Sequence, residues 1–343
     1  MEQTDGPMLV IGIGRGTSRS ISLIHENRGE NLDTLYISTD RKAVEYTKAR
    51  TKALIGKRLC GGFGADGLND LGERAAEDAK RDIEPYLQGY KMIVVVSTIG
   101  KGTGSGATPV ISSLAESTGA FVMNFLILPS ATLESMQRTV ANHTRHTMIN
   151  RGFNVVAIDQ DRFRQINGDQ PFATTLARLD ALLSGVLMSL NDLLFGDAER
   201  GVTTSDLKSL FKEGKEGSFF IGGGDPSKPS DAAAEFLSCG LLGRDPKTAK
   251  GILLNLVKPG KLNSNSTKPL IDEIFNRLGK GKTAFIGTMS EPDRIGSVDM
   301  IGIITGMDDG SVSLSKLCSK EKARPSPDKR PPSSGRWDIP MIR

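Results

Sequence analysis

The chain has few cysteines and no marked excess of charge of one sign, and each shortage excludes a class of protein. Its three cysteines, Cys60, Cys239 and Cys318, are odd in number and far apart, which excludes a disulfide framework and a zinc site and is typical of a reducing cytosol. A net charge of +4 over 343 residues is too small to indicate nucleic acid binding, because the lysines and arginines are scattered except near the C-terminus. We therefore expect a cytoplasmic protein without a nucleic acid partner.

Long apolar runs are also missing. No continuous apolar run reaches the ~20 residues that a membrane span needs, and the acidic N-terminus Met1–Asp5 is no signal peptide. We expect no direct membrane insertion, so that any membrane contact goes through a partner or the tail. Glycine, by contrast, is plentiful at 39 residues, which favours a loop-rich nucleotide-binding fold, and the length allows two domains.

The most informative glycines lie in residues 97–109, Ser-Thr-Ile-Gly-Lys-Gly-Thr-Gly-Ser-Gly-Ala-Thr-Pro, directly after the apolar run Met92–Val96. Four glycines alternate with other residues there, and the hydroxyl groups of Thr103 and Ser105 lie between them. A strand that ends in such a loop before a helix offers backbone N–H groups and a helix dipole to an anion. The segment therefore predicts a nucleotide polyphosphate site. It fits neither Walker A nor the dinucleotide motif, whose third glycine comes one residue early in Gly12–Thr17.

Apolar runs alternate with helical patterns along the first half of the chain. We expect strands at Met8–Ile13, Leu32–Ser38, Met92–Val96, Phe121–Leu128 and Val155–Ile158, and helices at about Thr17–Glu26, Asn69–Tyr86 (capped by Asn69), Ala107–Ser117 and Thr132–Ile149. This alternation predicts an α/β fold with a doubly wound, mostly parallel sheet, whose ligands bind at the carboxyl ends of the strands.

The second half begins with a long helical pattern over Phe172–Phe195, whose leucines recur every three or four residues and predict a helix buried between two bodies. A second, smaller α/β domain follows. Its expected strands are Ser218–Ile221, Gly251–Leu256, Thr283–Thr288 and Val298–Thr305, with helices at about Asp231–Ser238 and Pro269–Leu278. From Lys316 the composition shifts to Lys, Arg, Pro and Ser, which predicts disorder, and the last residues, Trp337–Arg343, turn apolar again.

These features together resemble the tubulin/FtsZ superfamily, and its FtsZ branch in particular. Residues 100–106 are similar to the family signature G-G-G-T-G-[ST]-G, with Lys101 in place of one glycine. Further similar segments are Ala107–Ile111, the phosphate loop Gly61–Gly67, Ser38–Asp40 in place of Asn-Thr-Asp, the strand Ala249–Asn255, and the terminal peptide Trp337–Arg343, which distinguishes FtsZ from tubulin and from the archaeal CetZ branch. The resemblance covers about residues 8–307 and the tail.

The resemblance implies a domain organisation and a set of partners. The implied segments are a GTP-binding domain at 1–170, a central helix at 171–197, a C-terminal α/β domain at 198–315, a disordered basic linker at 316–336 and an adaptor-binding peptide at 337–343. The implied ligands are GTP or GDP with Mg²⁺. The implied partners are further copies of this chain in a head-to-tail filament and a membrane adaptor that binds the terminal peptide at the division site. The tail also allows a simpler interpretation as a solubilising extension.

The family's nucleotide contacts carry over to the positions that match. For the phosphates these are Gly14, Arg15 (a glycine in the family), Gly16, Thr17, Ala65, Asp66, Gly102, Thr103, Gly104 and Ser105. Glu134 and Arg138 keep the family's E-x-x-x-R spacing, with Glu134 expected to accept from the ribose hydroxyls. Near the base, Gln160 replaces an Asn and Leu176 replaces a stacking aromatic residue. Asp180 would accept from N1–H and the N2 amine of guanine, and its alternative is a solvent-facing helix residue.

The family's catalytic loop, G-x-[IV]-N-x-D-F-x-D, aligns with Gly201–Ser209. In the family this loop enters the neighbouring subunit's site, where its carboxylates orient the attacking water. Asp206 keeps the first carboxylate, whereas Thr204 replaces the Asn and Ser209 replaces the second Asp. Asp206 is therefore the implied catalytic residue. It is alternatively a first-turn residue of a helix Leu207–Lys212 capped by Ser205.

Three functions follow from these patterns. The first is a GTP-hydrolysing, self-assembling division protein. The second is a structural GTP-binding filament, or a partner that co-assembles with a more active paralogue, with little hydrolysis. The third, a nicotinamide-dependent enzyme, lacks the G-x-G-x-x-G spacing and an acid/base pair. His143 and His146 share a helix face, but no Cys or carboxylate cluster completes a metal site, so we predict no metal ligands.

Overall fold

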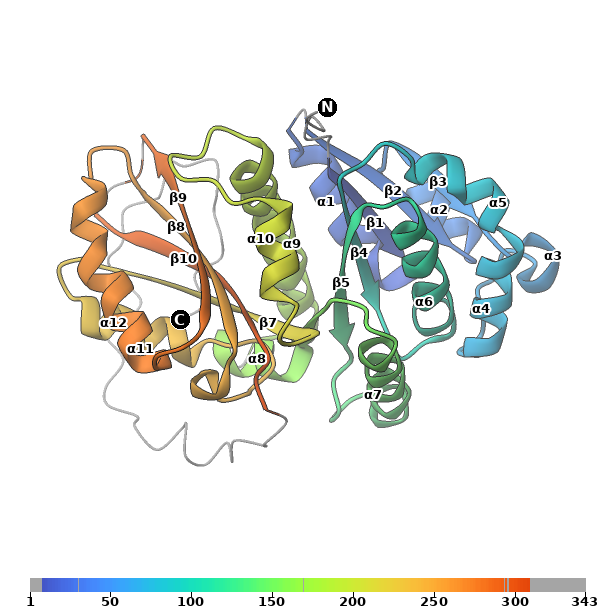
Figure 1. Cartoon of the computed structure of the whole chain (residues 1–343). Coiled ribbons are helices and arrows are strands. Elements are labelled where there is room, and N and C mark those ends of the chain that lie inside the picture. Colours follow the sequence, from blue (N-terminus) through green and yellow to red (C-terminus); the bar gives the residue numbers. More distant parts are fainter. Residues whose placement is uncertain (1–7, 30, 169, 293, 295, 309–343) are drawn as a thin grey trace.

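The computed structural model describes residues 8–308 except 30, 169, 293 and 295. The linker expected at 316–336 and the peptide expected at 337–343 lie outside the described residues. One sheet runs through the described chain, in the strand order β3-β2-β1-β4-β5-β6-β7-β10-β8-β9 (Figure 1). The strands are β1 (Met8–Ile13), β2 (Leu32–Ser38), β3 (Thr51–Leu54), β4 (Met92–Thr98), β5 (Phe121–Leu128), β6 (Val155–Asp159), β7 (Glu216–Gly224), β8 (Gly251–Pro259), β9 (Thr283–Glu291) and β10 (Val298–Thr305).

The sheet is mostly parallel, as the alternating pattern predicts. The strands from β3 to β7 pair in parallel, and so do β8 and β9, whereas β10 is antiparallel to both β7 and β8. The expected two halves share this one sheet, but β6 and β7 join them over only two residue pairs, Val155 with Glu216 and Val156 with Gly217. The four apolar runs at β1, β2, β5 and β10 have the bounds that the sequence predicts.

Helices cover both faces of the sheet. They are α1 (Ser18–Asn27), α2 (Arg41–Tyr46), α3 (Lys57–Cys60), α4 (Asn69–Asp78), α5 (Lys80–Ile83), α6 (Gly102–Ser117), α7 (Ser135–Asn150), α8 (Gln160–Asn167), α9 (Phe172–Phe195), α10 (Thr204–Leu210), α11 (Pro229–Ser238) and α12 (Lys268–Leu278), with 3₁₀ turns η1 (Arg15–Thr17), η2 (Glu84–Leu87), η3 (Pro246–Thr248) and η4 (Ser264–Thr267). Alternate residues of β1 face opposite layers. Met8 and Val10 pack with α1 and α9, whereas Leu9 and Ile11 pack with α4 and α6.

The central helix α9 lies between the two halves (Figure 1). Among the described residues it is the one helix that is long and apolar enough to cross a membrane by length and composition, although Arg178 and Asp180 interrupt its apolar residues and most of it is buried. Its side chains Leu183 and Leu187 instead belong to the largest buried cluster, together with Val94 of β4 and Ile303 of β10. The helix is therefore the shared core of both halves.

Two helices, α6 and α4, begin or end at residues other than those that the sequence predicts. α6 begins at Gly102, five residues earlier than expected, so that most of the glycine-rich segment is helical. The helix expected at Asn69–Tyr86 ends at Asp78, and α5 and η2 follow it. Asn69 is its first residue and makes no capping bond; Leu68 is the N-cap. α8, which the sequence did not predict, begins at Gln160 and is capped by Asp159.

Candidate nucleotide-binding site

The N-terminus of α6 has free backbone donors. Its N-cap, Lys101, has an extended backbone and makes no side-chain capping bond. The first bond within the helix is Ser105 N–H to Lys101 O, at 2.9 Å. The N–H groups of Gly102, Thr103 and Gly104 therefore have no partner inside the helix, and they lie at the positive end of its dipole. This geometry is typical of a site for a phosphate group.

The alternating glycines serve packing rather than loop flexibility. A Cβ atom on Gly104 would lie 2.1 Å from the carbonyl oxygen of Thr98, and one on Gly106 would lie 2.1 Å from that of Asn69. Gly102 is similarly close to the backbone of Ala65. Each side chain would collide with backbone atoms that cannot move aside. The absence of side chains thus lets α6 sit directly against β4, α4 and the neighbouring loop.

The turn after β1 approaches the same helix end. Gly14 has φ 81°, and a Cβ there would lie 3.4 Å from Gly104 N. The carbonyl oxygen of Gly14 accepts from Thr17 N–H at 3.1 Å, from Thr17 Oγ1 at 3.0 Å and from the hydroxyl of Tyr36 at 3.1 Å. Thr17 is fully buried, so both of its donors stabilise the turn rather than face the site. Arg15 and Gly16 are the exposed residues of the turn. The Tyr36 contact is one that the sequence did not indicate.

The loop Gly61–Gly67 is a further segment that lies beside the start of α6. Its glycines 61, 62, 64 and 67 have positive φ, and so does Asp66, at 43°, although it is not a glycine. The loop is tied to the end of β2, since Arg41 N–H donates to Gly62 O at 2.8 Å and Gly64 N–H donates to Thr39 O at 3.2 Å. Thr39 Oγ1 in turn lies 2.6 Å from Thr103 Oγ1. Three segments far apart in the sequence therefore surround the start of α6.

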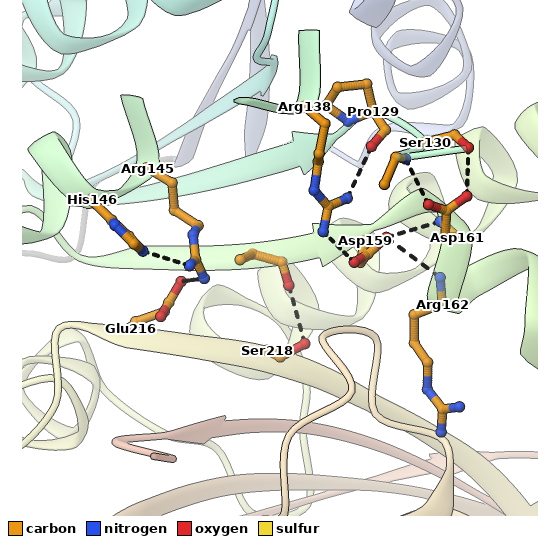
Figure 2. Close-up of polar contacts among 12 residues, drawn as sticks. Pro129, Ser130, Arg138, Arg145, His146, Asp159, Asp161, Arg162, Glu216 and Ser218 are labelled. Atoms are coloured by element: carbon orange, nitrogen blue, oxygen red, sulfur yellow. Dashed lines mark hydrogen bonds and ion pairs between the residues drawn. The ribbon is translucent and has the colours of Figure 1, made fainter. Parts of the chain in front are cut away.

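The loop after β5 is held by paired charges. Lys101 Nζ lies 2.8 Å from Glu134 Oε1. Arg138 donates to Pro129 O at 2.9 Å and to Asp159 Oδ2 at 2.5 Å (Figure 2). Arg138 therefore positions the loop between β5 and α7.

Ser105 of α6, expected at the phosphates, is buried, and its Oγ accepts from Gly100 N–H at 2.6 Å.

Residues expected at the base lie on α8 and α9. Gln160 is 8% exposed, and its Oε1 has no hydrogen-bond partner among the described residues, as an acceptor awaiting a ligand would be. Asp180 accepts from Ser20 Oγ at 2.5 Å and lies 3.6 Å from Arg19 Nε. Burial raises the pKa of Asp180, and Ser20 and Arg19 oppose the rise. The side chain of Asp180 is 13% exposed, so the alternative interpretation of Asp180 as a solvent-facing helix residue is wrong. Leu176, one turn earlier on α9, is half-buried.

Asp206 lies on α10, which Figure 1 shows beside α9 and apart from α6. It forms a capping box with Thr203: Asp206 N–H donates to Thr203 Oγ1 at 3.2 Å, and Thr203 N–H donates to Asp206 Oδ2 at 2.8 Å. The expectation that Ser205 caps this helix is wrong, because Thr203 does so. Ser209 Oγ donates to Ser205 O inside the helix. The chain thus does not bring Asp206 to the other site residues within one molecule.

The segment that leads to α10 is anchored at the edge of the sheet. Lys258 on β8 is 2% exposed, and its Nζ contacts Glu199 Oε1 at 2.9 Å and Leu262 O at 2.8 Å. Arg200 pairs with Thr288 of β9 as an isolated bridge. These contacts fix the segment that leads to α10, and no pattern in the sequence indicates them.

Known proteins resemble this chain over most of its length. Residues 8–168 match the model of the Tubulin/FtsZ family, GTPase domain. "Cell division protein FtsZ 1" of Archaeoglobus fulgidus is 26% identical over 301 residues, which cover 87% of this chain and 81% of that protein. "Cell division protein FtsZ" of Methanothermobacter thermautotrophicus is 26% identical over 281 residues, 81% and 73% of the two chains.

Solved structures agree in fold. An empty FtsZ dimer from M. jannaschii superposes with a TM-score of 0.81 at 25% identity and covers 89% of each chain. A GTPgS-bound protofilament of CetZ2 from Haloferax volcanii gives a TM-score of 0.73 at 18% identity, covering 91% of this chain and 96% of that one, which is a likeness of fold alone.

Proposed function

Because this chain belongs to the tubulin/FtsZ family, we propose that it is a GTPase of the cell-division cytoskeleton that assembles head to tail into filaments. The observation that supports this most is the uncapped N-terminus of α6, where the N–H groups of Gly102–Gly104 have no partner inside the helix and two glycine-rich turns lie close by. Backbone donors and a helix dipole bind phosphate well. The exposed Arg15 and Gly16 contribute from the turn after β1.

Guanine selectivity would come from Asp180. A carboxylate accepts two hydrogen bonds side by side, and guanine offers N1–H and the N2 amine, a pair that adenine lacks. Asp180 has to release Ser20 and Arg19 in part to do so. The unpartnered Oε1 of Gln160 suits a second contact to the base, and Glu134 suits the ribose hydroxyls once it leaves Lys101.

Mg²⁺ enters with the nucleotide in this proposal. The described residues contain no group of three or more His, Cys, Asp or Glu side chains that could hold a metal ion by itself. This donor set fits Mg²⁺ brought by GTP, because that ion keeps several waters and binds through phosphates and one or two carboxylates. Asp66 is the carboxylate of the glycine loop on that side.

Hydrolysis requires a second subunit. The helix α10, which carries Asp206, lies beside α9 and apart from α6 in Figure 1, so Asp206 would orient the attacking water in the site of the next molecule. A site completed by the neighbour makes a heterologous contact that does not close, and such contacts yield filaments. Loss of the γ-phosphate at the junction would then weaken the filament.

A second function is a structural filament with little hydrolysis, alone or with a paralogue. The supporting observation is that Asp206 Oδ2 already accepts from Thr203, while Ser209 has no carboxylate to add. In both cases the peptide 337–343 would bind a membrane adaptor, and the protein would act in the cytoplasm at the division site.

The deciding experiment measures GTP turnover per subunit against protein concentration, together with light scattering. Turnover that rises as scattering appears supports the first function, because the site is complete only between subunits. Scattering with background turnover supports the second. Purified protein that retains no guanine nucleotide and binds neither GTP nor GDP would refute both.

A further inference from the structure

Arg15 lies where the family resemblance implies a glycine, and its side chain has little to hold it. It is the first residue of η1, and its side chain is 85% exposed. Its Nη1 lies 3.8 Å from Asp40 Oδ2, which is an ion pair but too long for a hydrogen bond. An exposed pair of this kind is weak. The guanidinium group can therefore leave Asp40 for a stronger anion at little cost.

The position of Asp40 shows in which direction Arg15 reaches. Asp40 pairs with Phe63 of the glycine loop as an isolated bridge, and its side chain caps α2 by accepting from Ala43 N–H at 3.1 Å. Arg15 itself begins in the turn next to Gly104. The side chain thus extends from the turn beside the start of α6 towards Asp40, which is bridged to the loop 61–67.

We propose that Arg15 is a catalytic residue that stabilises the transferred γ-phosphoryl group in cis, an inference that rests on the proposed GTPase function. In the reaction, a water oxygen bonds to the γ-phosphorus, the bond to the β,γ-bridging oxygen breaks, and its electron pair stays on GDP. One proton of the water goes to solvent and the other remains on the phosphate. Charge develops on the equatorial and bridging oxygens, and a guanidinium group on them is effective.

This role connects two differences between this chain and the family pattern, namely Arg15 in place of a glycine and the altered catalytic loop. The catalytic loop has lost an Asn and a carboxylate at Thr204 and Ser209, which reduces what the neighbouring subunit contributes. A cation supplied by the nucleotide-binding subunit itself compensates for part of that loss, since phosphoryl transfer depends mainly on positioning and charge.

The test uses the full chain below the concentration at which it assembles, so that no neighbour contributes. The probe is GDP with Mg²⁺, with and without aluminium fluoride, which mimics the transferred phosphoryl group. We expect fluoride to tighten GDP binding to the parent. Arg15→Ala should lose most of that effect but keep its affinity for GDP alone, and Arg15→Lys should be intermediate. In assembled protein, Arg15→Ala should lower turnover on the order of 100-fold.

The matched control is Arg28→Ala, which removes the same charge at the far, exposed end of α1. It should behave as the parent. The inference is overturned if Arg15→Ala keeps the fluoride effect, or if the parent binds GDP and shows no fluoride effect. A parent that binds no GDP instead refutes the proposed function, so the two failures are distinguishable.

Discussion

Thr203 and Asp206 cap helix α10 reciprocally: the threonine hydroxyl accepts from the aspartate N–H, and the aspartate Oδ2 accepts from the threonine N–H and hydroxyl. The side chain that the family resemblance assigns to catalysis is therefore also a structural element of its own helix. A substitution at Asp206 has two consequences, one for stability and one for turnover, and they can be separated.

Asp206→Ala should abolish GTP hydrolysis and spare GTP binding, because the carboxylate would act only in the neighbour's site. It should also lower the free energy of unfolding by about 0.5–2 kcal/mol, the usual cost of a lost cap. Asp206→Asn keeps an oxygen for Thr203 and should lose hydrolysis with little loss of stability. Urea unfolding and phosphate release measure the two effects. Turnover by Asp206→Ala at the parent's rate would show that the loop is not catalytic.

Gly104→Ala tests the packing of the glycine-rich helix. The new Cβ would lie 2.1 Å from Thr98 O, so β4 or α6 has to shift. We expect a loss of about 1–3 kcal/mol in the free energy of unfolding and weaker GDP binding, measured by urea unfolding and by titration. Gly29→Ala is the control, since nothing lies within 4 Å of a Cβ there. Equal stability of the two variants would contradict the packing argument.

Most strands were predictable because continuous buried apolar runs set their limits, as at Phe121–Leu128, whereas the short and only partly buried β3 was not predicted. The glycine-rich segment was not, since its helical state depends on how closely Thr98 and Asn69 approach, which are contacts between segments rather than within one. The cap at Thr203 was within reach of the sequence, because Thr-x-x-Asp has the spacing of a capping box.

The candidate site was predictable as a set of segments and not as a set of free groups. Motifs identify the turn after β1, the loop 61–67 and the start of α6, which the fold brings together. They do not reveal that the N–H and hydroxyl of Thr17 both donate to the carbonyl oxygen of Gly14. Nor do they reveal that the hydroxyl of Ser20 donates to the carboxylate of Asp180, 160 residues away. Such partners follow from the packing of α1 on α9.

Asp180→Asn should stabilise the fold at neutral pH. Burial raises the pKa of Asp180 despite Ser20 and Arg19, so the folded protein holds this proton more tightly than the unfolded chain. The ionised group therefore costs stability at pH values above the raised pKa, and this cost disappears as the pH falls to the unfolded value of 3.8 and below. Urea unfolding at pH 7 and at low pH should show a gain that vanishes in acid. The variant should also lose its preference for GTP over ATP.

Asp33→Asn provides the control of opposite sign. Burial alone would raise the pKa of Asp33, but the hydrogen bonds from Arg50 and Tyr90 outweigh it and lower the pKa. Its ionised form therefore contributes stability above the unfolded value of 3.8, and that stability is lost as the pH falls through the lowered pKa. Asp33→Asn should be less stable than the parent at pH 7. A gain in stability for both variants would contradict the assignment of these shifts.

Glu216 joins the two halves of the molecule through buried charge. Its carboxylate lies 2.7 Å from Arg145 Nη1 of α7 and 2.6 Å from Arg244 Nη2 of the loop before β8, and each of the three side chains is at most 10% exposed. Figure 2 shows the first of these pairs, with His146 beside it. Glu216→Gln would remove the buried carboxylate that both guanidinium groups contact at the narrow β6–β7 junction.

We expect Glu216→Gln to lower the free energy of unfolding by about 3–5 kcal/mol, as broken buried pairs do. The control Glu26→Gln breaks the exposed pair with Lys48 and should cost about 0–1 kcal/mol. Replacing all three charged residues by Met or Leu should restore most of the stability, because the carboxylate and both guanidinium groups that it contacts are then removed together. A triple variant as unstable as Glu216→Gln would show that packing volume, and not charge, holds the halves together at this point.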